Sequence, residues 1–342
     1  MHQKLTRTML DIAIDKGLKE IRTKSKRGIR NLVDLGAHFA KGRFQEYFYQ
    51  IAQNMLENED SSYYDLVFNT VNNVDNNILK TFGINIGLNS WTYGANTIRE
   101  KENCYEYNTP WAIIFDFTIP TAISLNSSDI LKSISDGKDM GIFSYIAFIN
   151  DNTSLKENLF EAFEKNPDCA FILFADPNNL DINDILKIKN LKNILISINM
   201  EEMKENQELL STVELLKENK CLYGIHSIYD DKDTETILNN EWINKIVNLT
   251  STFAFLIHSK NCKKENIAKV SSYIQDMKTN QKYPTFLIDL YEDMSYVSKI
   301  ISSKSCFIKI LQDGKIITEN ENTNSNLNIT NIKLEDIFSF SC

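Results

Sequence analysis

From residue 111 to residue 280 the sequence alternates short apolar runs with amphipathic stretches, and this alternation restricts the possible folds strongly. The runs are rich in β-branched and aromatic residues and read WAIIFDF, IFSYIAFI, CAFILFA, NILISIN, LYGIHSI and FAFLIH. Apolar strands separated by helices are typical of a parallel sheet that is covered on both faces. Six such units predict an α/β barrel or most of one, with a doubly wound open sheet as the alternative.

The segments on either side of this alternation have different patterns. The N-terminal stretch is predicted to be helical, since FQEYFYQIAQNML places aromatic and aliphatic side chains at helical spacing. Near the other end, FLIDLY precedes CFIKILQDGKIIT, which is predicted to form a hairpin that turns at Asp313-Gly314. We therefore expect an N-terminal helical region (1–105), a partial α/β barrel (106–283) and a small C-terminal extension (284–342).

Hydropathy and cysteine spacing indicate where such a chain works. No apolar run is long enough for a transmembrane helix, and charges interrupt the N-terminal segment where a secretory signal would be apolar. The cysteines are widely spaced and form no CxxC pair, so we expect reduced thiols in a cytoplasmic protein. They are Cys104, Cys169, Cys221, Cys262, Cys306 and Cys342.

Charge is distributed unevenly along the chain. The net charge is −9, but residues 1–30 carry nine Lys or Arg and three acidic residues, which leaves −15 for the remainder. An acidic body argues against general nucleic-acid binding. The basic segment 1–30 is expected to be either a solvated helix face or an attachment surface for an acidic partner, a membrane surface or RNA.

Several stretches resemble radical S-adenosylmethionine (radical SAM) enzymes that have a SPASM-like C-terminal extension. They are FGINIGLNSWTYGANTIREKE, YNTPWAIIFDFT, ISDGKDMGIFSYIAF, DCAFILFADPN, NILISIN, FLIDLYEDMSYV and FIKILQDGKIITE. The resemblance covers roughly residues 30 to 318 and consists of short word matches rather than one decisive motif. It implies a partial (β/α)6 barrel, in agreement with the number of alternating units, and a C-terminal hairpin that is a vestige of the family's extension.

The residues with which this family binds its cofactors are missing. The family has CxxxCxxC after the first barrel strand, where three thiolates hold a 4Fe–4S cluster, and GGEP after the second, where S-adenosylmethionine binds. Here Phe117 to Ser124 contain no cysteine, and Asn150-Asp151-Asn152 follow the second strand. The stretch that corresponds to the auxiliary-cluster region contains one cysteine, Cys306. We therefore expect a degenerate member of the family with no iron–sulfur cluster, no other cofactor and no metal.

Polar residues near the ends of the predicted strands are the remaining candidates for a site. In α/β barrels the chemistry lies at the C-terminal ends of the strands. Two histidines and several carboxylates on one rim would suit a divalent metal or acid–base catalysis. The alternative is that they are ordinary turn and helix-cap residues, with histidines that are satisfied by hydrogen bonds. The candidates are Asp116, Asn150, Asp151, Asp176, Asn199, His226 and His258.

These observations lead to competing hypotheses. The first is a radical SAM-like pseudoenzyme without catalytic residues, a scaffold that binds a protein or peptide, with an intact radical SAM enzyme as one candidate partner. The second is an enzyme for metal-assisted hydrolysis at the barrel rim that uses Asp116, Asp176, His226 and His258. A third is binding of a small molecule in a vacated barrel mouth. Under the first hypothesis we expect a partner to dock on segment 1–30 or on the hairpin edge, and removal of 1–30 to leave the barrel's stability nearly unchanged.

Overall fold

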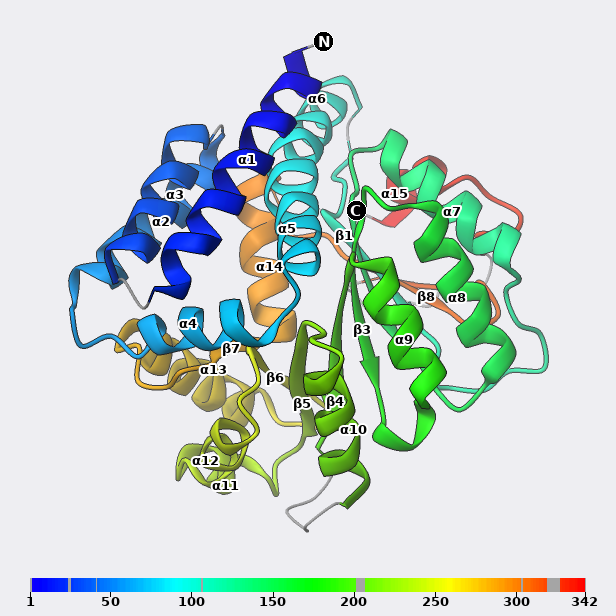
Figure 1. Cartoon of the computed structure of the whole chain (residues 1–342). Coiled ribbons are helices and arrows are strands. Elements are labelled where there is room, and N and C mark those ends of the chain that lie inside the picture. Colours follow the sequence, from blue (N-terminus) through cyan, green and yellow to red (C-terminus); the bar gives the residue numbers. More distant parts are fainter. Residues whose placement is uncertain are drawn as a thin grey trace. The chain divides into compact units, whose positions relative to one another are not determined.

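The structure, a computed structural model, describes residues 2–23, 26–40, 42–105, 107–200, 207–302, 304–318 and 327–341 (Figure 1). The chain forms two compact units, and each is considered by itself. Unit 1 comprises residues 1–41, 45–80 and 198–292, and unit 2 comprises residues 42–44, 81–197 and 293–342. These units do not follow the three-part division that the sequence pattern suggests, which stays a prediction.

Unit 2 contains a sheet with the strand order β3-β2-β1-β8-β9. Strand β1 is parallel to both of its neighbours, β2 and β8, and β2 is parallel to β3, whereas β8 and β9 are antiparallel. The predicted hairpin is thus confirmed, and it lies in the same sheet as the first strand. The strands are β1 (Ala112–Asp116), β2 (Ser144–Phe148), β3 (Ala170–Ala175), β8 (Ile308–Leu311) and β9 (Ile316–Thr318).

Helices follow the parallel strands of unit 2 in chain order and cover one face of its sheet. The Tyr145 hydroxyl on β2 donates to the Ile134 carbonyl at 3.0 Å, and the Phe163 ring lies 3.9 Å from that of Phe171 on β3. Because side chains alternate along a strand, Phe148 and Phe174 lie on the opposite face, here called the inner face. The helices are α7 (Ser127–Asp139), α8 (Thr153–Lys165) and α9 (Ile182–Leu191).

Two asparagines bind carbonyl groups at the N-terminal end of strand β3. The π-helix η1 (Asn85–Gly94) and helix α6 (Ala95–Cys104) precede β1. The Asn85 amide donates to the carbonyls of Pro167 and Cys169 at 2.9 and 2.8 Å, and the Asn89 amide donates to that of Asp168 at 2.8 Å. The carbonyls that precede β3 are thereby satisfied, and η1 is fixed to this end of the strand.

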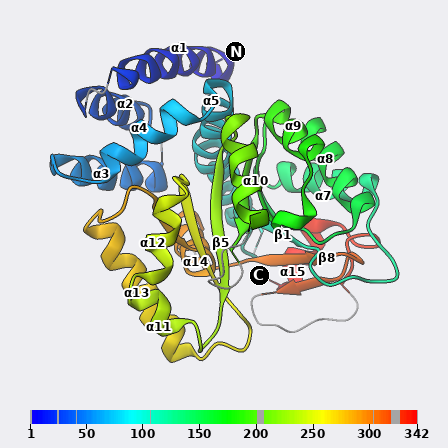
Figure 2. The same ribbon diagram turned by 60° about the horizontal axis from the view of Figure 1, so that its bottom comes forward.

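Unit 1 combines N-terminal helices with three further parallel strands. Strand β6 pairs in parallel with β5 and β7, and Figure 2 shows α11, α12 and α13 beside these strands. The N-terminal helices bury a cluster around Tyr64, whose hydroxyl donates to the Leu56 carbonyl at 2.6 Å. The elements are α1 (His2–Arg22), α2 (Lys26–Phe39), α3 (Arg43–Glu57), α4 (Tyr63–Asn73), α5 (Asn76–Ile84), α10 (Gln207–Glu218), β5 (Tyr223–Tyr229), α11 (Thr234–Leu238), α12 (Glu241–Asn248), β6 (Phe253–His258), α13 (Lys264–Thr279) and β7 (Phe286–Asp289).

The α/β fold class that the sequence predicts is confirmed, as is the helical N-terminal region. Strand β4 (Ile194–Asn199) spans the boundary between the units, and α14 (Leu290–Ile301) and α15 (Leu334–Ser341) complete the described elements. The segment FLIDLY, expected in the C-terminal extension, contains β7 and continues the parallel series of unit 1. Within the described part of the chain, no helix combines the length and the apolar character that a bilayer crossing requires.

Candidate functional site

The candidate site is the C-terminal rim of the unit 2 sheet. We call residues 117–126, which connect β1 to α7, the first loop. The rim consists of this loop together with Asp116, residues 150–152, Asp176 and Gln312. All of these residues belong to unit 2, so their mutual arrangement is defined.

One buried side chain, that of Gln312, joins three parts of the rim. Its Nε2 donates to Ser124 Oγ in the first loop at 2.6 Å, and its Oε1 accepts from the Asn150 amide at 3.4 Å. Its carbonyl also accepts the Leu125 N–H at 2.8 Å. Gln312 is 2% exposed. A buried amide stabilises a fold only where its polar atoms are paired, so this residue fixes the first loop to the end of β8.

Further hydrogen bonds hold the rest of the first loop. The Phe117 N–H donates to the Phe148 carbonyl at 2.9 Å, so the loop leaves β1 beside β2. At its far end, the Asn158 amide donates to the Leu125 carbonyl at 3.3 Å. A capping box between Asn126 and Asp129 then begins helix α7. The loop is therefore short, ordered at both ends and followed at once by a helix.

Asp116 and Asn150 act as turn and cap residues in this rim. The Asp116 carboxylate accepts from the Thr118 N–H at 3.3 Å and from its hydroxyl at 2.6 Å. The side-chain oxygen of Asn150, Oδ1, accepts the Asn152 N–H at 2.9 Å, and Asn152 in turn caps α8. These contacts agree with the turn-and-cap alternative for both residues.

The two carboxylates proposed for hydrolysis in unit 2 lie apart. In the sheet register, Asp116 stands between Leu311 on β8 and Phe148 on β2, so its neighbours in the same row are apolar. Asp176 follows β3, which is separated from β1 by β2. Two strand spacings amount to about 10 Å, and Phe148 on β2 stands beside Asp116 in this interval.

The two candidate histidines belong to unit 1 and lie on opposite faces of its sheet. His226 is in register with Phe255, and His258 is in register with Tyr229, three residues beyond His226. Residues three apart on a strand point to opposite faces, so these two imidazoles do not converge. The expectation that His226 ends its strand was wrong, because β5 continues to Tyr229.

The surroundings of the histidines are those of packed residues. His226 is buried in mid-strand. The His258 ring packs edge-to-face on Tyr291 with the centroids 4.9 Å apart, and its Nδ1 lies 3.3 Å from the Ser259 carbonyl. Asn199, another candidate, is the buried last residue of β4. Among the residues that the structure describes, no three His, Cys, Asp or Glu side chains gather as a metal site would require.

The cysteines differ from the prediction at one position. Cys104, Cys169, Cys221 and Cys262 are not in disulfides. Burial raises the pKa of the Cys169 thiol well above its ordinary value, which favours the protonated form over the thiolate that binds iron. Cys306 is disulfide-bonded, so the prediction of reduced thiols is wrong there. Cys342 lies outside the described residues.

The hairpin edge, predicted as a docking surface for an extended chain, is partly occupied by the protein itself. Strand β8 lies between β1 and β9, so of the two hairpin strands only β9 is at an edge of the sheet. The Ile316 N–H donates to the Leu327 carbonyl at 3.2 Å, and the Ile329 N–H donates to the Gly314 carbonyl at 3.0 Å. Residues 327–329 thus cover part of that edge, which leaves less of it for a partner strand.

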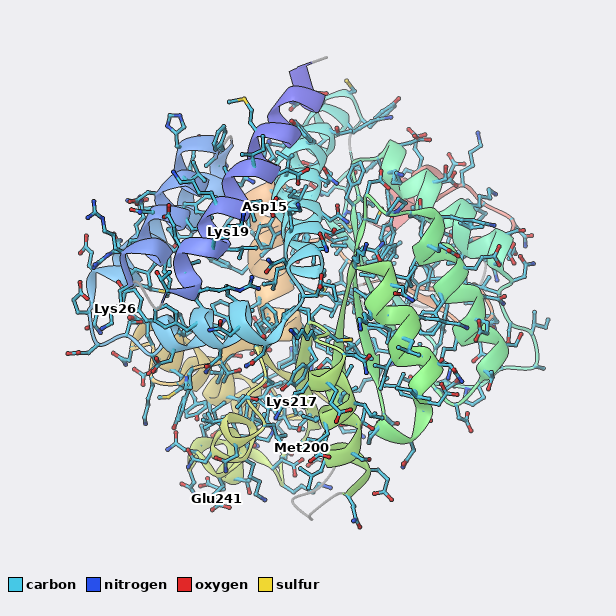
Figure 3. The ribbon with its side chains drawn as sticks, in the orientation of Figure 1. Asp15, Lys19, Lys26, Met200, Lys217 and Glu241 are labelled. Atoms are coloured by element: carbon cyan, nitrogen blue, oxygen red, sulfur yellow. The ribbon has the colours of Figure 1, made fainter. Side chains whose placement is uncertain are left out.

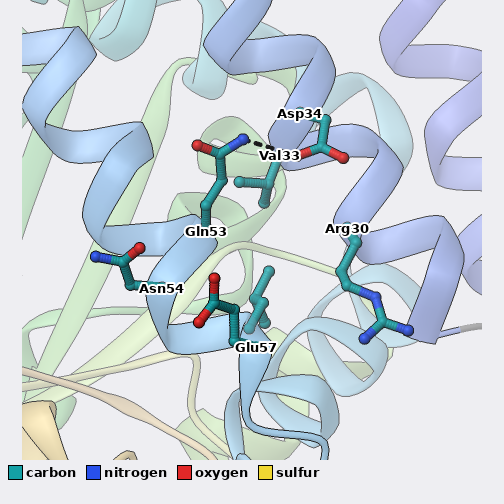
Figure 4. Close-up of a pocket in the computed structure, with 7 residues that line it drawn as sticks. Arg30, Val33, Asp34, Gln53, Asn54 and Glu57 are labelled. Atoms are coloured by element: carbon teal, nitrogen blue, oxygen red, sulfur yellow. Dashed lines mark hydrogen bonds between the residues drawn. The ribbon is translucent and has the colours of Figure 1, made fainter.

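Unit 1 has a cavity of about 510 Å³ between α2 and α3, and it contains none of the candidates (Figure 4). The Gln53 amide donates to Asp34 across this cavity at 2.8 Å. The lining residues are Arg30, Val33, Asp34, Gln53, Asn54, Leu56 and Glu57.

The basic N-terminal segment is partly neutralised within unit 1. Lys26 and Arg30 both pair with Glu59, and Lys80 lies 3.2 Å from Asp15. Figure 3 labels Asp15 and Lys19 on α1 and Lys26 at the start of α2. The hydrogen bond between Arg30 and Glu59 raises the pKa of Arg30 and lowers the pKa of Glu59. Part of the positive charge of segment 1–30, which was considered as a partner surface, is therefore already paired.

Comparison with known proteins gives a match in fold only. No protein-family model and no curated protein matches the sequence. The structure is similar to that of the radical SAM enzyme SuiB from Streptococcus suis bound to S-adenosylmethionine, with a TM-score of 0.54 and 11% identity over 71% of this chain and 67% of SuiB. SuiB bound to its precursor peptide SuiA gives a TM-score of 0.53 at 11% identity, over 71% and 68% of the two chains.

A third SuiB structure matches with a TM-score of 0.50 and 11% identity, over 67% of this chain and 65% of that one. The chain therefore spans about two thirds of the length of SuiB. At this identity the likeness concerns the fold, and it agrees with the partial barrel that the sequence predicts. The protein thus has a radical SAM-like α/β fold.

Proposed function

We propose that this protein is a radical SAM-like pseudoenzyme that holds no iron–sulfur cluster and works by binding a peptide or a protein. The first loop carries this proposal. A 4Fe–4S cluster needs thiolates close together on the chain that wraps it, and residues 117–126 contain no cysteine. Both ends of the loop are fixed, by the Phe117 N–H and by Gln312, so no length is spare to wrap a cluster.

The inner face beside this loop is occupied by large aromatic side chains, which suit the binding of a peptide or protein better than cofactor chemistry. The rings of Phe148 and Phe174 stack there with the centroids 4.6 Å apart. Phe148 is in register with both Asp116 and Phe174, and it ends the second strand, where the family pattern has glycines that approach S-adenosylmethionine. Two large rings take up space that a nucleoside would need.

The peptide part of the proposal is supported by one neighbour and one surface. SuiB, which has the same type of fold, is known in a structure bound to its precursor peptide SuiA. In this chain the first loop exposes Ile119 and Ile123 at the rim. We therefore propose a peptide, or a protein such as an intact radical SAM enzyme, as the partner. Metal-assisted hydrolysis gains no support, because His226 and His258 lie on opposite faces.

A peptide selection tests this function directly. Protein purified with a chelator is used to select binders from a displayed library of random peptides, and the affinity of the selected peptides is measured by calorimetry. We expect saturable, stoichiometric binding that is unchanged after the protein is treated anaerobically with iron and sulfide. Failure to select any peptide above background, or binding that requires the iron treatment, would contradict the proposal.

A further inference from the structure

The first loop displays apolar side chains although it is firmly anchored. Ile119 and Ile123 are 62% and 73% exposed, more than any other large apolar side chain described in unit 2. The loop that carries these exposed side chains is held by hydrogen bonds. The Thr121 hydroxyl donates to the Ile123 carbonyl at 2.5 Å, and the Ser124 hydroxyl accepts from Gln312. Pro120 restricts the backbone between the two isoleucines. Ordered loops that present apolar side chains to water are characteristic of interaction surfaces.

The charged side chains of the rim to which these isoleucines belong are carboxylates. The first loop itself has no charged side chain. Lys156 pairs with Asp184 at 2.6 Å, and Lys315 pairs with Asp313 at 2.8 Å, so these two lysines are already engaged. The further charges at the described rim are three carboxylates, Asp116, Asp151 and Asp176, and one half-buried lysine on β8, Lys309.

We propose that the first loop and the acidic rim form the docking site for a cationic peptide segment that contains an aliphatic residue. The aliphatic side chain packs on Ile119 and Ile123, and neighbouring Lys or Arg side chains pair with Asp116 and Asp151. This inference rests on the proposed function and names the class of peptide. It also gives the first loop, which holds no cluster, a role in recognition.

The charge of the rim argues against other occupants. An anionic bilayer and a nucleic acid would both be repelled by the exposed carboxylate of Asp151 and the half-buried ones of Asp116 and Asp176, so a cationic polypeptide fits best. A second copy of this chain has a net charge of −9, so charge repulsion opposes its docking on the acidic rim. A separate cationic peptide is therefore the occupant to which the rim is complementary.

The test uses fluorescence anisotropy with labelled model peptides of equal length, which alternate Lys with Leu, Glu with Leu, or Lys with Ser. We expect the Lys–Leu peptide to bind saturably and more weakly as salt rises. Ile119→Ser and Ile123→Ser should each weaken this binding about fivefold, which corresponds to about 1 kcal/mol for a central interface contact. Asp151→Asn should weaken it and reduce its salt dependence.

Matched controls separate docking from general effects. Leu186→Ser removes an exposed apolar side chain on α9, and Asp139→Asn removes an exposed carboxylate at the C-terminal end of α7, away from the rim. Both should leave the affinity unchanged. Gel filtration with light scattering of each variant checks that it is folded and reports self-association.

Each alternative outcome overturns the inference in a recognisable way. Equal affinity of the wild-type protein and the Ile119 and Ile123 variants would place the peptide elsewhere and leave the proposed function standing. Equal affinity for the Glu–Leu peptide would remove the charge argument. A dimer that Ile123→Ser dissociates would make a second copy the occupant. If no model peptide binds the wild-type protein, the inference fails, and the random-peptide selection still decides the proposed function.

Discussion

The buried amide of Gln312 joins segments that are far apart in the sequence. Its bonds to Ser124, Asn150 and Leu125 connect the loop after β1, the end of β2 and the end of β8. The sequence shows only a glutamine before a predicted Asp-Gly turn, where an exposed side chain would be ordinary. Its role could not be predicted, because it depends on β8 lying beside β1.

Replacement of this residue should destabilise the protein measurably. Gln312→Ala leaves buried polar groups of the first loop without their partner, which costs about 1–3 kcal/mol in the free energy of unfolding. Urea denaturation followed by circular dichroism measures the change. Gln275→Ala, at an exposed position of α13, is the control and should be neutral. Equal stability of Gln312→Ala and the wild-type protein would show that the rim does not depend on this amide.

A second residue-scale prediction concerns Tyr145. Its hydroxyl donates to the carbonyls of Ile134 and Ile142 at 3.0 and 3.1 Å in the packed face between β2 and α7. Tyr145→Phe keeps the ring and removes the donor, so it should lower the free energy of unfolding by about 1–2 kcal/mol. Calorimetric melting of the purified variant measures this loss. An unchanged melting temperature would mean that the two carbonyls are satisfied in another way.

At the scale of elements, local patterns predicted which segments are strands and helices, but not how strands pair. The apolar runs from WAIIFDF to FAFLIH correspond to β1 to β6, and the Asp313-Gly314 turn joins β8 to β9. The place of β8 beside β1 and the cover of the hairpin edge by residues 327–329 arise from long-range pairing. His226 was misplaced for a related reason, since the end of β5 is set by its register with β6.

The start of helix α13 provides a pH-dependent prediction. The Asp231 carboxylate accepts from the Lys263 N–H at 3.0 Å and from the Asn266 amide at 2.7 Å, and these bonds lower its pKa below the ordinary value of an aspartate. A group with a lowered folded-state pKa stabilises the fold above its unfolded pKa, and this contribution is lost as the pH falls through the folded pKa. Asp231→Asn should therefore lower the melting temperature at neutral pH.

The difference between the wild-type protein and Asp231→Asn should shrink when the melting temperature is measured in progressively more acidic buffer. Asp129→Asn at the capping box of α7 serves as a second carboxylate variant. A difference between wild type and Asp231→Asn that stays constant down to acidic pH would contradict a role for the ionised carboxylate.

At the scale of the whole molecule, the N-terminal helices are part of a core rather than an attachment. Leu18 and Ile21 on α1 and Ile29 on α2 are buried with Leu56 and Tyr64. The basic composition of residues 1–30 suggested a surface segment that could be removed without effect. The basic composition gives no sign that apolar side chains of these helices pack within unit 1, as Leu18, Ile21 and Ile29 do.

Deletion of residues 1–30 should consequently destabilise the protein, contrary to the sequence-based expectation. Each buried Leu or Ile contributes about 1.5–3 kcal/mol, so loss of three such side chains should lower the thermal stability of unit 1 or prevent its folding. Thermal denaturation and limited proteolysis of the truncated protein measure this. Truncation that leaves both the melting temperature and the proteolysis pattern intact would restore the view of these helices as an appendage.

The account as a whole depends on the claim that this radical SAM-like fold has no iron–sulfur cluster. Anaerobic reconstitution with iron and sulfide, beside an active radical SAM enzyme as positive control, tests that claim most directly. We expect the desalted protein to retain no stoichiometric iron and to show no reductive cleavage of S-adenosylmethionine. A brown protein with stoichiometric iron and sulfide that cleaves S-adenosylmethionine under reducing conditions would contradict the account.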